Sequence, residues 1–295
     1  MPACPFRFCE QLSYSGCHQI LGPMLNRQSL WVIALLFSAT LLRAADAGTP
    51  VTVRHTEGNI HGFLALRAPE GETVAFGDIS QTNKGNIVTT HLVFHFKDGS
   101  LHDESATFSQ VRTFRLLRYK LIQKGPTFPM QLNVSMDGPN NQVTVHSTQD
   151  GKDKDESSHV TLPTTISNGL LSILVKNLTA DGAKLSMVAF TPKPQVVTLV
   201  FTSDGEENFS IGGVERKATR YNMKIEIGGI KGVIAPVVGK QPPDTKFWVL
   251  GGEAPAFLMS QGPLFYGGPT WRIELSSPTY PNESKKPESD ESHPK

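Results

Sequence analysis

The residues best suited to chemistry lie on one expected hairpin that turns at Asp98-Gly99. If these two residues form the whole turn, His95 faces His102 across the two strands. Side chains alternate along a strand, so His91 and Glu104 then share the face of those two histidines. Three imidazoles and one carboxylate are a ligand set that zinc and other transition metals accept. The hairpin therefore predicts a metal site, and with it a metal-dependent hydrolase as one candidate function.

A solvated polar face is the simpler interpretation of the same hairpin. A bulge of one residue would scatter the four side chains, and no His-x-His pair occurs within the strand. The opposite face, which carries Leu92, Phe94, Phe96 and Leu101, is then the core. We favour the polar face, and we expect no cofactor.

Other catalytic patterns are missing from the sequence. It contains no Gly-x-Ser-x-Gly elbow for a nucleophilic serine and no Gly-Lys-Ser/Thr loop for phosphate. No Gly-x-Gly-x-x-Gly opens a helix, and the glycine pairs stand among strands, where a turn is the simpler role. These patterns favour a non-catalytic protein.

A second group of candidate site residues is apolar and lies late in the chain. Turns at Gly262-Pro263 and Gly267-Gly268-Pro269 separate several of its members, which would let them line the mouth of a groove. A curved sheet partly covered by a helix leaves a concave apolar pocket that suits an acyl chain. The alternative is a core of aromatic side chains between sheet and helix. The expected groove residues are Phe247, Trp248, Phe257, Met259, Phe265, Tyr266 and Trp271.

The elements that position these residues are almost all strands. Runs rich in Val, Ile, Thr and Phe alternate with short turns, which favours antiparallel hairpins over βαβ units. We interpret the charged run Lys152–Glu156 as a hairpin tip. The expected strands are Ile60–Arg67, Thr73–Ile79, Ile87–Phe96, Phe114–Ile122, Leu185–Phe190, Val196–Thr202, Tyr221–Ile227, Val233–Val238, Phe247–Leu250, Phe257–Met259 and Trp271–Leu275.

One segment has the periodicity of a helix. Ile166, Leu170, Leu174 and Leu178 recur every four residues, and Asp181-Gly182 supplies a stop. The narrow polar side of this amphipathic helix indicates that it packs against the sheet. The predicted fold class is mainly β, with a large curved antiparallel sheet, half-barrel or sandwich-like, and one packed helix.

The N-terminal region predicts export. The apolar run 30–42 follows Arg27 and precedes Ala45-Asp46-Ala47, which is the order that a signal peptidase reads. The run is shorter than the roughly 20 residues of a membrane-spanning helix. We expect the true start at Met24 and cleavage after Ala47. The remainder is then periplasmic or secreted and has no transmembrane anchor.

Removal of the signal region 1–47 leaves a mature chain without cysteine, because all three cysteines precede the apolar run. This excludes disulfides, thiolate metal sites and a lipid-anchoring cysteine. The mature chain has a net charge near zero, which gives no electrostatic basis for binding nucleic acid. We expect a single β-rich domain over 48–276 and a disordered tail over 277–295.

Two segments carry a resemblance to known proteins. Phe96-Lys97-Asp98-Gly99-Ser100-Leu101 and Leu162-Pro163-Thr164, set in a long β-meander with one helix, resemble a group of uncharacterised bacterial periplasmic proteins. That group is similar in outline to the half-barrel lipoprotein carriers of the Gram-negative envelope. The resemblance covers Asn59 to Leu275 and implies a curved antiparallel sheet with the helix across its concave side. It implies no catalytic residue.

These features favour binding or scaffolding in the cell envelope. We expect a hydrophobic small molecule or a lipid as ligand, or an envelope protein as partner. The metal-dependent hydrolase is the alternative. An apolar cavity under the helix would favour binding, whereas imidazoles that converge on a cleft would favour catalysis.

Overall fold

The computed structural model describes residues 48–190, 194–211, 213–226 and 242–276. Four expectations fall outside this part of the chain, namely the signal region 1–47, its cleavage site Ala47, the strand Val233–Val238 and the tail 277–295. Within the described ranges, no helix has the length and apolar character that crossing a membrane requires.

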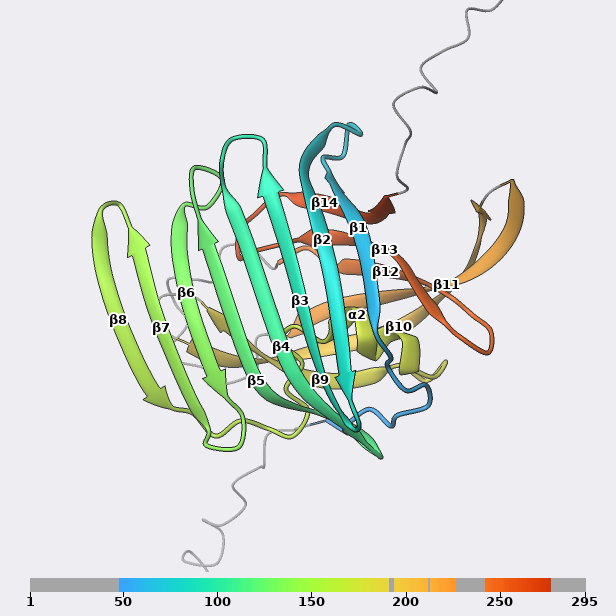
Figure 1. Cartoon of the computed structure of the whole chain (residues 1–295), viewed down its shortest axis with the longest axis horizontal. Helices are drawn as coiled ribbons and strands as arrows, with labels where there is room; N and C mark the ends of the chain where they lie inside the picture. Colours follow the sequence, from blue (N-terminus) through green and yellow to red (C-terminus); the bar gives the residue numbers. More distant parts are fainter. Residues whose placement is uncertain (1–47, 191–193, 212, 227–241, 277–295) are drawn as a thin grey trace, which may run out of the picture. The chain divides into compact units, whose positions relative to one another are not determined.

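The described residues form one curved antiparallel sheet of fourteen strands, which does not close into a barrel (Figure 1). This confirms the predicted fold class. The strand order across the sheet is β8-β7-β6-β5-β4-β3-β2-β1-β14-β13-β12-β11-β10-β9. The elements are β1 (Ile60–Arg67), β2 (Thr73–Lys84), β3 (Ile87–Phe96), β4 (Leu101–Val111), β5 (Thr113–Lys124), β6 (Met130–Asp137), β7 (Gln142–Gln149), β8 (Lys152–His159), α2 (Leu171–Leu174), the 3₁₀ turn η2 (Val175–Asn177), β9 (Ala183–Phe190), β10 (Pro194–Ile211), β11 (Val214–Glu226), β12 (Thr245–Leu250), β13 (Ala256–Pro263) and β14 (Thr270–Ser276).

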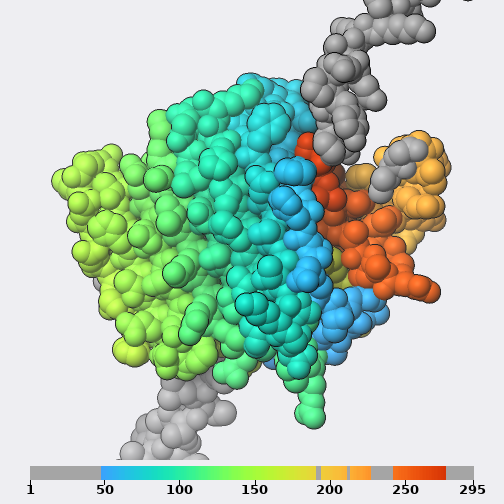
Figure 2. All heavy atoms as spheres, in the orientation of Figure 1, coloured from blue at the N-terminus to red at the C-terminus, as the bar shows by residue number. Residues whose placement is uncertain are grey.

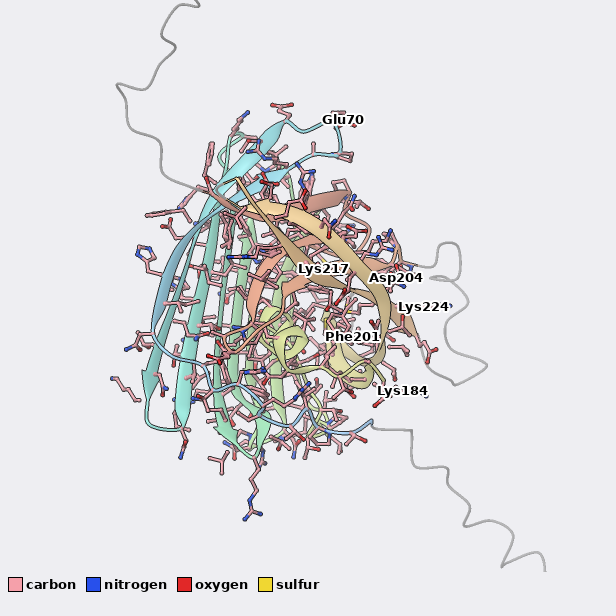
Figure 3. The ribbon with its side chains drawn as sticks, turned by 90° about the vertical axis from the view of Figure 1, so that its right-hand side faces the viewer. Glu70, Lys184, Phe201, Asp204, Lys217 and Lys224 are labelled. Carbon is pink, nitrogen blue, oxygen red and sulfur yellow. The ribbon has the colours of Figure 1, made fainter. Side chains whose placement is uncertain are left out.

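The first and last strands are neighbours inside the sheet. β1 pairs with β14, with Leu64 opposite Leu275, so β8 and β9 are the two edges. The connection between these edges, residues 160–182, therefore has to cross from one half of the sheet to the other. Figure 3 shows α2, which belongs to this connection, between the cyan-to-green strands and the orange strands. The sheet curls around it, and Tyr119 of β5 stacks on Phe190 of β9 with ring centroids 5.9 Å apart.

The helix in this connection is shorter than the sequence predicts. Helical periodicity begins at Ile166, but α2 begins at Leu171, because Gly169 has a φ of +70° that no right-handed helix accepts. Before that glycine the chain follows the edge of β9, where the Ser167 amide donates to the Ser186 carbonyl at 2.9 Å. The predicted packing is correct, since the apolar side chains of α2 and η2 lie in the core.

Two apolar clusters fill the concave side of the sheet. The larger one, which we call the main core, joins β3–β7 to the connection and to β9–β12. Phe108, Leu199 and Phe201 are among its most deeply buried side chains, and Figure 3 labels the last of them. The smaller cluster joins β1, β2, β3 and β14. Along most strands, such as β3 and β5, buried and exposed side chains alternate. This pattern is visible in the sequence, which is why these strands could be predicted.

The charged run Lys152–Glu156 was expected at a hairpin tip, and this expectation is wrong. The run lies in β8, and the tip is Asp150-Gly151, whose φ angles of 51° and 71° suit a two-residue type I′ turn. Six of the eight residues of β8 are exposed. Charges on an edge strand discourage pairing with a second chain, so the run protects this edge of the sheet.

Asn168 holds the connection to β9, and its replacement by alanine should destabilise the fold. Its side chain donates to the Val188 carbonyl and accepts from the Val188 amide, both at 2.9 Å, and all of these groups are buried. Asn168→Ala leaves that amide and carbonyl unpaired, so we expect a loss of about 2–3 kcal/mol in urea-induced unfolding. The control is Asn140→Ala in an exposed turn, for which we expect less than about 0.5 kcal/mol. Equal losses in the two variants would contradict this role.

Candidate functional site

The hairpin between β3 and β4 turns through three residues instead of two. The Phe96 amide donates to the Ser100 carbonyl at 2.9 Å, which closes Lys97-Asp98-Gly99 as the loop. The glycine has a φ of 85°, as the third residue of such a loop requires. The aspartate carboxylate accepts from the Ser100 amide at 2.9 Å and from the Thr127 hydroxyl at 2.7 Å. These two hydrogen bonds fix the longer turn.

The predicted register of this hairpin is therefore wrong by one residue. Leu101, and not His102, lies opposite His95. A shift of one residue moves every side chain of a strand to the other face of the sheet. His91 and His95 are exposed on the outer face, whereas His102 and Glu104 point to the concave side. Figure 2 shows that outer face of β2–β8 as a closely packed surface.

The predicted metal ligands are thus divided between two faces. His91 Nε2 lies 2.8 Å from Asp103 Oδ1 on the outer face, so a carboxylate already holds this imidazole. In the part of the chain that the structure describes, no three His, Cys, Asp or Glu side chains come together as metal ligands. The metal site stays a prediction, but the structure does not place its four expected ligands on one face of the sheet.

The inward orientation of His102 and Glu104 creates a polar band in the interior. The Tyr119 hydroxyl donates to Glu104 Oε1 at 2.7 Å, and Gln123 Nε2 lies 3.0 Å from His102 Nδ1. Both partners come from β5, the next strand of the sheet. Further along β4 the inward side chains belong to the main core, whereas the side chain opposite His102 on β3 belongs to the smaller cluster. We call these four residues the polar seam, because they lie between the two apolar clusters.

Burial changes the proton affinity of three groups in the polar seam. Loss of hydration lowers the pKa of His102 to about 4, against a smaller opposite effect of the Asp103 charge. Loss of hydration raises the pKa of Glu104, although the hydrogen bond from Tyr119 partly offsets this. The pKa of Tyr119 lies well above its ordinary value because of burial and then the Glu104 charge. At neutral pH the imidazole is therefore uncharged and the phenol keeps its proton.

Among the fully buried side-chain atoms that the structure describes, His102 Nε2 is the atom of the polar seam that lacks a hydrogen-bond partner. Gln123 Nε2 lies near Nδ1 of the same ring and 3.5 Å from the Leu264 carbonyl oxygen, so it donates between two acceptors. The neutral imidazole then carries its proton on Nε2. The residue is only 2% exposed, and a buried donor without an acceptor costs about 1–3 kcal/mol. This unexplained group marks the polar seam as a candidate binding site.

Aromatic side chains pack beside the polar seam. Phe96 lies 5.4 Å from Phe128 and 5.5 Å from Trp271, measured between ring centroids. Phe265 lies 5.3 Å from Phe128 and 6.0 Å from Trp271, so the four rings form a closed set, which we call the aromatic cluster. Phe265 belongs to the loop between β13 and β14 and is partly exposed, and the next residue, Tyr266, is 50% exposed.

The other residues of the expected groove lie elsewhere. Phe247 is buried in the main core and Phe257 packs against it. Trp248 points to the other side of β12, where its Nε1 donates to Glu207 Oε2 at 2.7 Å. Met259 is partly buried on β13. Of the seven predicted residues, the structure therefore brings together the two in the aromatic cluster, with Tyr266 next to them in the chain.

Sequence reasoning missed Tyr119 and Gln123. The signal that could have found them is the alternation along β5, where Tyr119, Leu121 and Gln123 share the buried face. The expected strand ended at Ile122, one residue too early to include the glutamine. A polar side chain in a row of buried positions is informative, because it needs a partner in the interior.

A pocket elsewhere in the structure involves none of the seam residues. It lies where the turn before α2 meets β5 and the β6–β7 turn. Its lining residues are Arg115, Leu116, Gly138, Pro139, Asn141, Leu162, Pro163, Thr164 and Ile166. It has no buried titratable group in its lining, so the polar seam is the stronger candidate.

No protein family and no curated protein matches this chain. Among solved structures, it is similar to the hypothetical lipoprotein YmcC from Escherichia coli, with 12% identity and a TM-score of 0.32 over 85% of this chain and 95% of that one. It is also similar to a beta-barrel-like protein of domain of unknown function DUF1849 from Brucella abortus, with 12% identity and a TM-score of 0.41 over 75% and 97% of the two chains. Likenesses of this size carry no argument about what the chain binds or does.

Proposed function

We propose that this protein is an exported, non-catalytic binding protein of the cell envelope that holds a hydrophobic or lipid ligand at the aromatic cluster. The observation that carries the proposal is the position of Phe265. Its ring packs on Phe128 and Trp271 but stays partly exposed, and it belongs to a loop next to the half-exposed Tyr266. A ligand that covered these rings would gain about 25 cal/mol for each Å² of apolar surface removed from water.

The sheet supports this proposal by the way it positions the aromatic cluster. The two apolar clusters fill its concave side, so the surface left for a ligand is the partly exposed part of the aromatic cluster. Rings on loops that a rigid sheet positions can contact a ligand while every strand of the sheet stays paired. The aromatic cluster has this arrangement, because β3 and β14 supply two of its rings and loops supply the other two.

Export is part of the proposal and has a test of its own. Fractionation of the native cell, followed by N-terminal sequencing, should find the protein outside the cytoplasm with Gly48 as its first residue. An intact chain in the cytosol would contradict this part of the proposal.

Ligand binding can be followed by the fluorescence of Trp271. The mature chain contains one further tryptophan, Trp248, which Trp248→Phe removes. We expect cis-parinaric acid to quench the remaining emission by energy transfer in a saturable manner. Phe265→Ala should weaken this binding about fivefold to tenfold, because it deletes one ring of the aromatic cluster.

The matched control is Phe76→Ala. This phenylalanine is 59% exposed on the outer face of β2, away from the concave lining, and its loss should leave the affinity unchanged. Circular dichroism would verify that each variant keeps its strands. A wild-type protein that binds no probe, and that releases no lipid in native mass spectrometry, would rule out the proposed function.

A further inference from the structure

We propose that the polar seam binds the neutral carbonyl oxygen of an acyl ester, with His102 Nε2–H as the donor and the acyl chain against the aromatic cluster. This inference rests on the proposed function and specifies the chemical class of its ligand. Three observations carry it. They are the free donor, the absence of positive charge around it, and the contact between the polar seam and the aromatic cluster.

The free donor calls for an acceptor. His102 is 2% exposed, and its Nε2 has no partner among the described residues. Gln123 occupies Nδ1, so the ring offers Nε2–H and nothing else to a ligand. A hydroxyl, amide or ammonium donor would find no lone pair on this atom. An sp² oxygen fits the donor, because it accepts in the plane of its carbonyl group.

The surroundings favour a neutral acceptor over a carboxylate anion. Glu104 follows two residues after His102 on the same face of β4, so its carboxyl group points to the same side of the sheet. Burial lowers the pKa of His102 to about 4, so this residue supplies no positive charge at neutral pH. A second carboxylate beside this one would add repulsion to the loss of hydration. An ester carbonyl avoids both costs.

The polar seam and the aromatic cluster adjoin each other. The Phe94 ring lies 6.3 Å from the His102 ring and belongs to the smaller apolar cluster, which includes the aromatic cluster. Gln123 reaches the Leu264 carbonyl oxygen at 3.5 Å, and the next residue is Phe265. One loop thus contacts both the polar and the apolar part of the site. An acyl ester likewise has a polar carbonyl group next to an apolar chain.

The test compares three probes of similar apolar character. They are cis-parinaric acid methyl ester, the free acid, and diphenylhexatriene, which has no carbonyl group. At pH 7.5 the wild-type protein should bind the ester several times more tightly than the acid. His102→Leu should weaken binding of the ester about fivefold to tenfold, with no change for diphenylhexatriene. His102→Gln, which keeps an N–H donor, should restore part of the affinity for the ester.

Glu104→Gln provides the matched variant for charge. It keeps an acceptor for the Tyr119 hydroxyl but removes the carboxyl group, so the preference for ester over acid should shrink. In the unaltered protein, ¹⁵N NMR of the histidines should show a shift of His102 Nε2 with the ester and none with diphenylhexatriene. This measurement does not depend on the folding of any variant.

The outcomes separate this inference from the proposed function. If His102→Leu weakened the binding of diphenylhexatriene and of the ester by the same factor, the inference would be overturned. The histidine would then act only through the fold. Unchanged ester affinity in that variant, or an unchanged His102 signal on saturation with ester, would overturn it as well and would leave hydrophobic binding in place. A wild-type protein that binds none of the three probes would overturn the proposed function itself.

Discussion

Lys176→Met is expected to lower the free energy of unfolding by about 3–5 kcal/mol. Lys176 Nζ lies 2.8 Å from Glu57 Oε2, and the two side chains are 15% and 6% exposed. The variant leaves the carboxylate in this buried position, where the Gln81 amide still donates to it at 3.1 Å. A neutral amide offsets less of the lost hydration than an ammonium group does, which is why the expected loss is large. Urea-induced unfolding, followed by circular dichroism, measures it.

An exposed ion pair provides the control for this prediction. Lys217 lies 3.6 Å from Glu206, with side chains 72% and 59% exposed, so Lys217→Met should cost less than about 1 kcal/mol. Addition of Glu57→Gln to the Lys176→Met variant should recover most of the lost stability, because the uncompensated charge is then gone. Equal losses for the two lysine variants would show that the buried pair contributes no more than the exposed one.

The second large effect is a dependence on pH that arises from His102. Its pKa is about 4 in the folded protein and 6.5 in its ordinary state, so the unfolded chain binds the proton first as pH falls. The contribution of this residue to stability is complete above pH 6.5, declines as pH falls below that value, and is lost at about pH 4. A shift of this size corresponds to about 3 kcal/mol. Unfolding curves at a series of pH values between 4 and 7.5 measure it.

Glu104 acts in the opposite direction and must be separated from His102. Its pKa is raised in the folded protein, so its proton uptake stabilises the fold as pH falls towards the ordinary glutamate range. We therefore expect the steepest dependence of the free energy of unfolding on pH in the Glu104→Gln variant. When His102→Leu is added to Glu104→Gln, the free energy of unfolding should change little between pH 6.5 and 4. A slope that survives His102→Leu would assign the acid sensitivity to other groups.

Strand positions were largely predictable from the sequence. The expected bounds of β1 and β3 match the structure at both ends. Period-two alternation and turn residues decide these positions, and both are local properties of the chain. β6, β7 and β8 were not among the expected strands. The side chains of β8 carry charge and hydroxyl groups instead of a buried apolar row. Its strand conformation comes from pairing with β7, which no local pattern in its own residues indicates.

The candidate site was much less predictable than the strands. Asp98-Gly99 suggests a two-residue turn, but the aspartate binds the Thr127 hydroxyl, which lies on a distant loop. That tertiary contact moves the register of β4 by one residue, and this places His102 inside. Gly169 has a similar effect on the helix, because its backbone turns the chain away from helical geometry to follow β9. In both places a contact between distant segments overrides the local preference.

The pairing of β1 with β14 has a consequence for how fast this protein folds. β1–β8 pair in chain order through short loops, and β9–β14 also pair in chain order, although residues 227–244 separate β11 from β12. The junction of the two halves joins Leu64 to Leu275 and has to wait until the last strand is available. Non-local contacts of this kind slow folding, and during synthesis β14 is the last of the described strands to emerge. We expect the junction to limit the folding rate, with the early half exposing an unpaired β1 edge to chaperones until β14 arrives.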